Sequence, residues 1–367
     1  MIEAVNFKNF KTLKDVECGL SQLTVLVGPN GSGKSTFLQG MHLLSKVVQT
    51  QRDFKPEYLF RGSQTLLQLR SSEVDDADLV LECETNGDAF EFRASTIPQH
   101  HGSWHDCGEN WFCKFTEKTT DEPNEAQSTI ASLGYYDLQH SYLARPSIAE
   151  DEVPYLQHTG EGLASMIAYL ILSAPDSFTQ LMAMVRIVVP QLQTIRVQKK
   201  KITRIEKETV SIRDKTVTTR VPRTVIGESL VFDFINRKNV TAFNVSEGTM
   251  LVIGLLTLLH GPSRPEIILL DDIEKGLHPD AQRELIVLLR QILAKRSDLQ
   301  IVATSHSPYF LDFLKFDEVR VMALGSDGYS ICGRLESHAK FEKWKEELAP
   351  GEMWSLFGEK WLSEGAK

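Results

Sequence analysis

Cysteine is scarce in this chain. Five cysteines occur among 367 residues, at scattered positions and with no C-x-x-C pair. Secreted disulfide frameworks use an even number of cysteines, and structural zinc modules use paired ones, so the sequence indicates neither. We expect free thiols in a reducing compartment.

Long apolar runs are also lacking. The longest, residues 249–259, is followed by His260, Gly261 and Pro262, well short of the roughly 18 residues that a bilayer span needs. The first seven residues have neither the basic start nor the apolar core of a signal peptide and read instead as a strand. The sequence therefore predicts no membrane span and a cytoplasmic location.

The chain as a whole lacks a net positive charge, because 49 acidic residues outnumber 40 basic ones and give a formal net charge of -9. Any contact with nucleic acid must then come from a local basic patch. Residues 196–223 hold ten basic and three acidic side chains. This segment alternates β-branched and charged residues, which predicts a long hairpin or small sheet. Duplex DNA could bind through Lys199, Lys200, Lys201 and Arg204, and a partner-docking surface or a solvated hairpin face explains the charges equally well.

The sequence contains one strong motif. Residues 28–35 read Gly-Pro-Asn-Gly-Ser-Gly-Lys-Ser, which satisfies G-x-x-x-x-G-K-[ST], between an apolar strand at 23–27 and a helix over about 35–49. In this setting backbone N–H groups surround phosphate oxygens, the Lys supplies a cation, and the Ser hydroxyl can ligate magnesium. The candidate nucleotide-binding residues are Asn30, Gly31, Ser32, Gly33, Lys34, Ser35 and Thr36.

A second element is an apolar run at 266–270 that ends in Asp271 and Asp272. Ligands of parallel sheets bind outside the carboxyl ends of the strands, so a carboxylate there would lie beside the phosphate loop. We expect Asp271 to face the magnesium and Asp272 to act as general base for water. Another buried strand, at 301–304, leads to His306, which could touch the γ-phosphate or the attacking water.

Ser246 and Gly248 form a Ser-x-Gly turn directly before a helix. A serine hydroxyl and helix N-terminal amides suit an anion. By itself the tripeptide is weak evidence.

In order and spacing, these elements resemble the AAA_21/RecF-like family of stand-alone ATPases, relatives of the SMC heads. The resemblance also covers residues 6–11, 160–163 and the turn at 276–279, which corresponds to the D-loop. It implies an ABC-type cycle of ATP and Mg²⁺ in which the signature, Ser246 and Gly248, contacts the γ-phosphate held by the other subunit of a homodimer.

The sequence departs from this family at Asp272, where a hydrolytic Glu is usual. The side chain is one methylene shorter, so we expect ATP hydrolysis to be slow, and Glu274 could partly substitute. The glutamine that links magnesium to the moving lobe in such folds is hard to place. Gln139 is our assignment, with Gln64 as the alternative.

The predicted fold is α/β, an ABC-type ATPase head whose phosphate-loop parallel sheet carries an antiparallel β region and a helical insertion. We expect an N-terminal ATPase lobe at 1–96, an inserted helical and β lobe at 97–240 that holds the basic hairpin, and a C-terminal ATPase lobe at 241–367. Residues 97–135 show no clean period and read as irregular.

Two functions remain open. The ATP cycle could open and close a dimer on DNA, or the ATPase could sense or restrain a separately encoded nuclease or toxin, as in stand-alone ATPases of bacterial defence. About 45 residues follow the strand near Val321, too few for a further catalytic domain, so any cutting would need a partner. A transporter subunit is disfavoured because the stretch between Ser35 and Ser246 is too long for that class.

Overall fold

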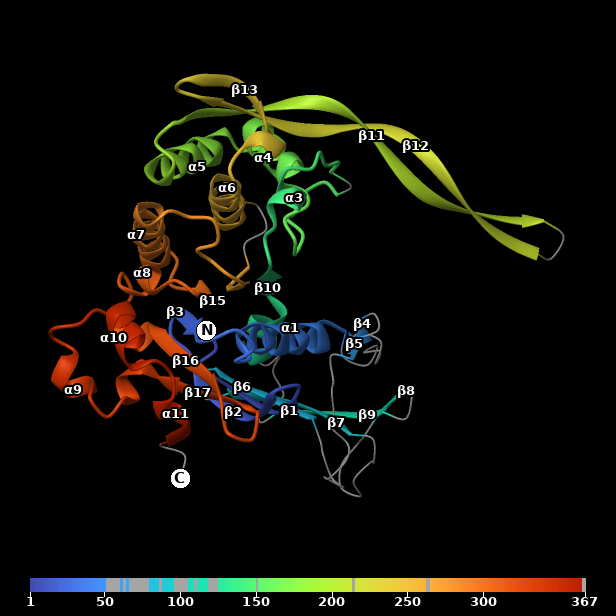
Figure 1. Cartoon of the computed structure of the whole chain (residues 1–367). Coiled ribbons are helices and arrows are strands. Elements are labelled where there is room, and N and C mark those ends of the chain that lie inside the picture. Colours follow the sequence, from blue (N-terminus) through green and yellow to red (C-terminus); the bar gives the residue numbers. More distant parts are fainter. Residues whose placement is uncertain are drawn as a thin grey trace. The chain divides into compact units, whose positions relative to one another are not determined.

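The computed structural model describes residues 1–50, 60–61, 64–65, 79–85, 88–95, 105–108, 111–117, 125–149, 151–212, 215–261 and 265–364. The chain divides into two compact units (Figure 1). The first unit comprises residues 1–136, 265–274 and 286–367, and the second comprises 137–264 and 275–285. No helix among the described residues is long and apolar enough to cross a membrane.

The first unit contains two six-stranded sheets. One is antiparallel, in the order β2-β1-β6-β7-β9-β8. Its strands are β1 (Ala4–Phe10), β2 (Leu13–Gly19), β6 (Leu79–Thr85), β7 (Asp88–Ser95), β8 (His105–Gly108) and β9 (Trp111–Glu117). A separate pair, β4 (Phe60–Arg61) and β5 (Gln64–Thr65), is also antiparallel.

The other sheet has the order β10-β14-β15-β3-β16-β17 and is parallel except for its last strand. Its strands are β3 (Leu23–Val27), β10 (Leu133–Tyr136), β14 (Ile267–Leu270), β15 (Gln300–Thr304), β16 (Val319–Leu324) and β17 (Ser330–Arg334). The three central strands are apolar and buried at nearly every position, as expected of parallel strands covered on both faces.

Helix α1 (Lys34–Thr50) joins the two sheets into one core. Phe37 on α1 packs edge-on against Phe7 of β1, with ring centroids 5.1 Å apart. The same cluster of buried side chains includes Ile267 of β14 and Val302 of β15. Further helices of this unit are short: α2 (Glu125–Ala131), α8 (Pro308–Leu311), α9 (Phe341–Trp344), α10 (Pro350–Phe357) and α11 (Trp361–Glu364).

The second unit is built around α6 (Glu247–His260), which is buried along most of its length. Helices α3 (His140–Leu143), α4 (Leu163–Ser173) and α5 (Pro175–Val188) pack against it. Helix α7 (Pro279–Lys295) begins in this unit and ends in the first. The helical insertion that the sequence predicts is thus present as α4 and α5.

The expected long hairpin is also present. Strands β11 (Leu192–Ile212) and β12 (Lys215–Phe234) pair antiparallel along their whole length, and we call them the basic arm. The short strand β13 (Arg237–Thr241) pairs with the base of β12, and beyond that base the arm is two strands wide (Figure 1).

The expectation that residues 97–135 are irregular was wrong, because they contribute β8, β9, α2 and β10. β10 was missed because it is four residues long and contains Gly134, and a short run with a glycine carries no readable period.

Candidate functional site

The phosphate loop connects β3 to α1, as its motif requires, and its glycines are sterically necessary. Gly28 and Gly33 have φ of 147° and 101°, values that residues with a Cβ rarely adopt. A Cβ at Gly28 would lie 2.0 Å from the backbone oxygen of Met322, and one at Gly33 would lie 2.3 Å from Ser330 Oγ. The loop is therefore held tightly against β16 and β17.

Lys34 is 5% exposed, and its ammonium donates to the backbone oxygens of Gly28 at 2.9 Å and Pro29 at 3.1 Å. Burial lowers the pKa of Lys34, opposed by the nearby carboxylates of Asp272 and Asp271. The hydroxyl of Ser32 is buried without a hydrogen-bond partner among the described residues. A buried cation and an unpaired hydroxyl in a glycine-rich loop fit an anionic ligand such as a nucleotide phosphate.

Hydroxyl and carboxylate groups from four elements converge at the carboxyl ends of the parallel strands. Asp271 follows β14, and its Oδ1 accepts from Thr304 Oγ1 of β15 at 2.6 Å and from Ser35 Oγ of α1 at 3.1 Å. Its Oδ2 lies 3.4 Å from the hydroxyl of Tyr135 on β10. Magnesium beside phosphates takes oxygen ligands from one or two protein groups, and this donor set fits such an ion.

Asp272 and His306 lie next to this group. Asp272 has φ 51°, in the left-handed region that Asp and Asn tolerate better than most residues. Its backbone N–H donates to Thr304 Oγ1 at 2.8 Å, and its Oδ1 lies 3.7 Å from His306 Nε2. Both side chains are partly exposed, so the pair can reach a ligand in the loop.

Glu274 is buried behind this pair, 8% exposed. Its Oε1 accepts from the backbone N–H of His306 at 2.7 Å, while Oε2 has no partner among the described residues. The three residues proposed for catalysis from the sequence therefore lie together, with Glu274 in a position to orient His306.

Gln139 belongs to the second unit, where its side chain donates to Asp137 Oδ2 at 2.9 Å. It follows the end of β10 by three residues, and the last residue of β10, Tyr136, accepts from the backbone N–H of Asp271 at 3.0 Å. The alternative, Gln64, lies on β5, and its side chain is outside the described part of the chain. The assignment of Gln139 stays a prediction.

The signature residues lie at the start of α6. Ser246 is exposed at the N-cap position, and its hydroxyl donates to Thr249 Oγ1 at 2.8 Å instead of capping the helix. Gly248 is packed against the D-loop, where a Cβ would lie 2.3 Å from the backbone oxygen of Gly276. Ser246, Gly248, Gly276 and His278 line one cavity of the second unit.

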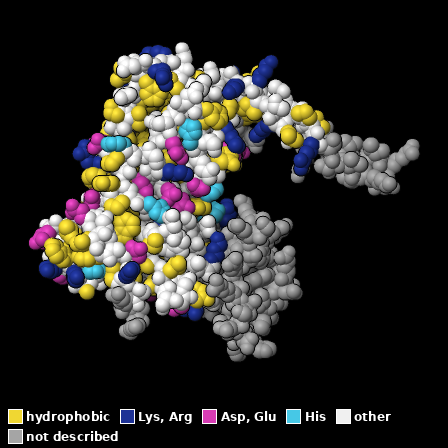
Figure 2. Space-filling view, viewed as in Figure 1, with side chains coloured by type: hydrophobic (Ala, Val, Ile, Leu, Met, Phe, Trp, Pro, Cys, Tyr) yellow, Lys and Arg dark blue, Asp and Glu magenta, His cyan; other side chains and the backbone are white. Residues whose placement is uncertain are grey.

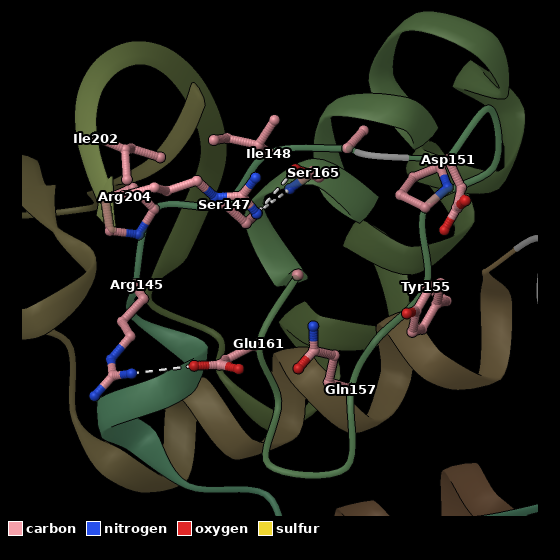
Figure 3. Close-up of a pocket in the computed structure, with 14 residues that line it drawn as sticks. Arg145, Ser147, Ile148, Asp151, Tyr155, Gln157, Glu161, Ser165, Ile202 and Arg204 are labelled. Carbon is pink, nitrogen blue, oxygen red and sulfur yellow. Dashed lines mark hydrogen bonds and ion pairs between the residues drawn. The ribbon is translucent and has the colours of Figure 1, made fainter. Parts of the chain in front are cut away.

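The basic side chains of the arm differ in their pairing and in their surroundings. Figure 2 shows Lys and Arg side chains along its described part. Lys199 pairs with Glu228 at 2.6 Å, and Arg204 lines a cavity at the base of the arm together with Arg145 and Glu161 (Figure 3). The Arg145–Glu161 pair in that cavity is 3.0 Å long. Lys200 and Lys201 are exposed on opposite faces of the ribbon, because adjacent residues of a strand alternate.

The sequence matches a known family over most of its length. The family model is described as "AAA domain, putative AbiEii toxin, Type IV TA system", and it matches residues 23–312. Two curated proteins share short segments: the OLD nuclease of Thermus scotoductus, 41% identical over 56 residues, and the Septu protein PtuA of Bacillus thuringiensis, 39% identical over 82. These segments cover 15% and 22% of this chain but only 11% and 20% of the two relatives.

Solved structures share the fold. An SMC head bound to the C-winged helix domain of ScpA superposes with a TM-score of 0.55 at 14% identity, covering 93% of this chain and 99% of that one. An SMC head with an extended coiled coil, bound to the C-terminal domain of ScpA derived from Pyrococcus furiosus, gives 0.51 at 12% identity, covering 94% and 99%. The predicted ABC-type head is thus confirmed as an SMC-head-like α/β fold.

Proposed function

The chain belongs to the AAA_21 family, and from that premise we propose that it binds ATP with magnesium and hydrolyses it slowly. One observation carries the proposal: Ser35, Asp271 and Thr304 converge from three elements directly beside the buried ammonium of Lys34. A phosphate loop and an oxygen cluster at the same strand ends are what a magnesium nucleotide requires.

In this proposal Lys34 and the loop amides hold the β- and γ-phosphates, with Asn30, Gly31, Ser32, Gly33 and Thr36 completing the loop. The hydroxyl of Ser35 and the carboxylate of Asp271 hold the ion, with Gln139 as a further ligand. When bound, the magnesium ion neutralises charge that develops on the phosphates. Asp272 accepts a proton from the attacking water, and His306 contacts the γ-phosphate or that water.

The test is equilibrium binding of ATP with magnesium, followed by phosphate release. Lys34→Ala removes a charge-assisted contact, which at about 2–3 kcal/mol corresponds to a loss of affinity of roughly 100-fold. Lys46→Ala is the matched control, because Lys46 lies on the same helix and its ammonium donates to Gln49 Oε1 at 3.1 Å instead of the loop. Unchanged affinity in Lys34→Ala would show that the loop does not hold the nucleotide.

We further propose that ATP closes a homodimer through Ser246 and Gly248. The exposed hydroxyl of Ser246 and the first amides of the 14-residue helix α6 form a surface that suits an anion. The same cavity of the second unit includes the D-loop residues Gly276 and His278, so a partner's nucleotide could meet both segments at once.

We also propose that the cycle of ATP binding and hydrolysis lets the chain act on a separately encoded effector protein. Two observations favour this over a DNA clamp. Lys199 is paired with Glu228, which lowers the net charge of the four-residue patch as a phosphate track. The relatives with matching segments are a nuclease and a Septu protein, which agrees with the coupling of such ATPases to effectors in defence. DNA binding through the arm remains the second candidate, and the salt dependence of binding separates the two.

A further inference from the structure

Two cysteines face each other where the two sheets of the first unit meet. Cys18 lies on β2, an outer strand of the antiparallel sheet, and Cys332 lies on β17, an outer strand of the other sheet. β2 and β17 contact each other, and the two thiols share a hydrogen bond. Cys18 is 3% exposed, and Cys332 is half-buried. The two thiols are therefore a preformed pair at the edge of the core cluster.

Two arginines adjoin the pair. Arg320 of β16 is 3% exposed, and its Nε donates to the backbone oxygen of Gly19 at 2.7 Å. A Cβ on Gly19 would lie 3.0 Å from Arg334 Nη2. The hydrogen bond from Cys332 lowers the pKa of the Cys18 thiol, and Arg320 and Arg334 add to this effect, whereas burial opposes it. The hydrogen bond to Cys18 and burial raise the pKa of Cys332. Of the two thiols, Cys18 therefore has the greater thiolate character and is the better nucleophile.

We propose that Cys18 and Cys332 are a redox pair that peroxide closes to an intramolecular disulfide, linking the two sheets of the ATPase unit. One thiolate attacks the peroxide oxygen and becomes a sulfenic acid, with release of one water. The second thiol then attacks that sulfur and displaces a second water. Two thiols and one hydrogen peroxide give one disulfide and two waters. A dithiol reductant reverses the bridge by exchange.

The disulfide would affect the phosphate loop through strand β17 and Ser330. Thiols in hydrogen-bond contact must approach to about 2.05 Å between sulfurs, which draws β17 toward β2. Ser330, two residues before Cys332 on β17, donates from its N–H and its hydroxyl to the backbone oxygen and Oγ1 of Thr12, each at 2.8 Å. Ser330 packs so closely against Gly33 that a Cβ on Gly33 would clash with it. A shift of β17 therefore displaces the loop. Oxidation should therefore weaken ATP binding, a consequence that rests on the proposed nucleotide site, whereas the disulfide itself does not.

The experiment treats the purified full-length protein with hydrogen peroxide and maps its disulfides by digestion without reductant. We expect a linked peptide pair containing Cys18 and Cys332, and a loss of about 2 Da, the mass of two hydrogens, from the intact chain. Oxidised wild type should bind ATP at least about 10-fold more weakly, a perturbation of about 1.4 kcal/mol, and dithiothreitol should restore the affinity. Cys332→Ser should keep its affinity under peroxide, and Cys83→Ser should respond as wild type.

Because Cys18 is buried, Cys18→Ser can fail to fold. In that case Cys332→Ser and Cys332→Ala are used for the test. If peroxide yields sulfenic or sulfinic acid on either cysteine without the linked peptide, the redox pair is wrong. If the bridge forms but ATP affinity is unchanged while Lys34→Ala still weakens binding, the link to the loop is wrong. Should Lys34→Ala also leave binding unchanged, the nucleotide site fails, and peptide mapping still decides the disulfide.

Discussion

The backbone N–H of His306 donates to the buried carboxylate of Glu274 at 2.7 Å. This bond ties the turn after β15 to the turn after β14, the two turns that carry His306 and Asp272. Because the donor is the backbone N–H of His306, this hydrogen bond positions the residue without using a ring nitrogen of the imidazole. Glu274 thus fits a positioning role better than the role of a second base.

Glu274→Ala should lower phosphate release by about 10-fold, because loss of an oriented contact typically costs about 1–1.5 kcal/mol. ATP affinity should change less than the rate, since the hydrogen bond of Glu274 is to His306 and its effect on Lys34 is the smaller one after those of Asp272 and Asp271. Glu274→Gln keeps an acceptor oxygen and should recover most of the rate. Steady-state phosphate release beside equilibrium binding separates the two effects, and equal loss in Gln and Ala variants would favour a direct chemical role for the carboxylate.

Asp272→Asn should abolish most hydrolysis while preserving nucleotide binding. Removing a general base typically costs about 100-fold or more in rate, and Asn tolerates the φ of 51° at this position. The variant should also accumulate the ATP-bound dimer, which light scattering measures. A variant that hydrolyses ATP at the wild-type rate would remove Asp272 from the mechanism.

Ser246→Arg should prevent ATP-dependent dimerisation without unfolding the monomer, because Ser246 is exposed and a bulky cation there blocks close approach. Ser173→Arg, at an exposed position on α4 of the same unit, is the matched control. Light scattering with saturating ATP and magnesium should give a monomer for the first variant and a dimer for the second. A wild type that stays monomeric, together with a monomeric Asp272→Asn, would exclude the ATP-bridged dimer.

Substitutions in the basic arm distinguish best between a DNA partner and a protein partner. Replacing Lys199, Lys200, Lys201 and Arg204 with Gln should weaken binding of duplex DNA and flatten its dependence on salt if the arm contacts phosphates. Basal ATP hydrolysis should survive, because these residues lie outside the nucleotide site. The double change of Lys340 and Lys343 to Gln, in the first unit, controls for general loss of charge.

Under the effector proposal, wild-type binding to DNA should be weak and indifferent to these four changes. Lys200→Gln with Lys201→Gln should account for most of any loss that does occur, because Lys199 is already paired with Glu228. Tight, salt-dependent binding that the four changes abolish would place the DNA clamp ahead.

The strongest sequence signals predicted most of the fold's centre. The phosphate loop, the strand ending in Asp271 and the strand before His306 depend on local patterns, buried apolar runs followed by polar residues, and each appears where expected. β10 was not predictable, because a four-residue strand is defined by its neighbour β14 and not by its own period. The contact of Glu274 with the His306 backbone was equally hidden, since it joins residues 32 positions apart. The proximity of Cys18 to Cys332 depends on the meeting of two sheets, which no spacing in the sequence encodes.

The length of the basic arm has a mechanical consequence. At about 3.3 Å per residue, the 21 residues of β11 span roughly 70 Å. The base of this ribbon is anchored by the Arg196–Asp233 pair at 2.9 Å and by the bridge between Ser147 and Glu228. The bridge at Glu228 lies opposite Lys199, so the remaining 13 residues of β11 extend roughly 43 Å beyond it, and a rotation of about 10° there would sweep the far end through roughly 7 Å. The arm therefore converts a small angular change at its base into a displacement of several ångströms at its far end.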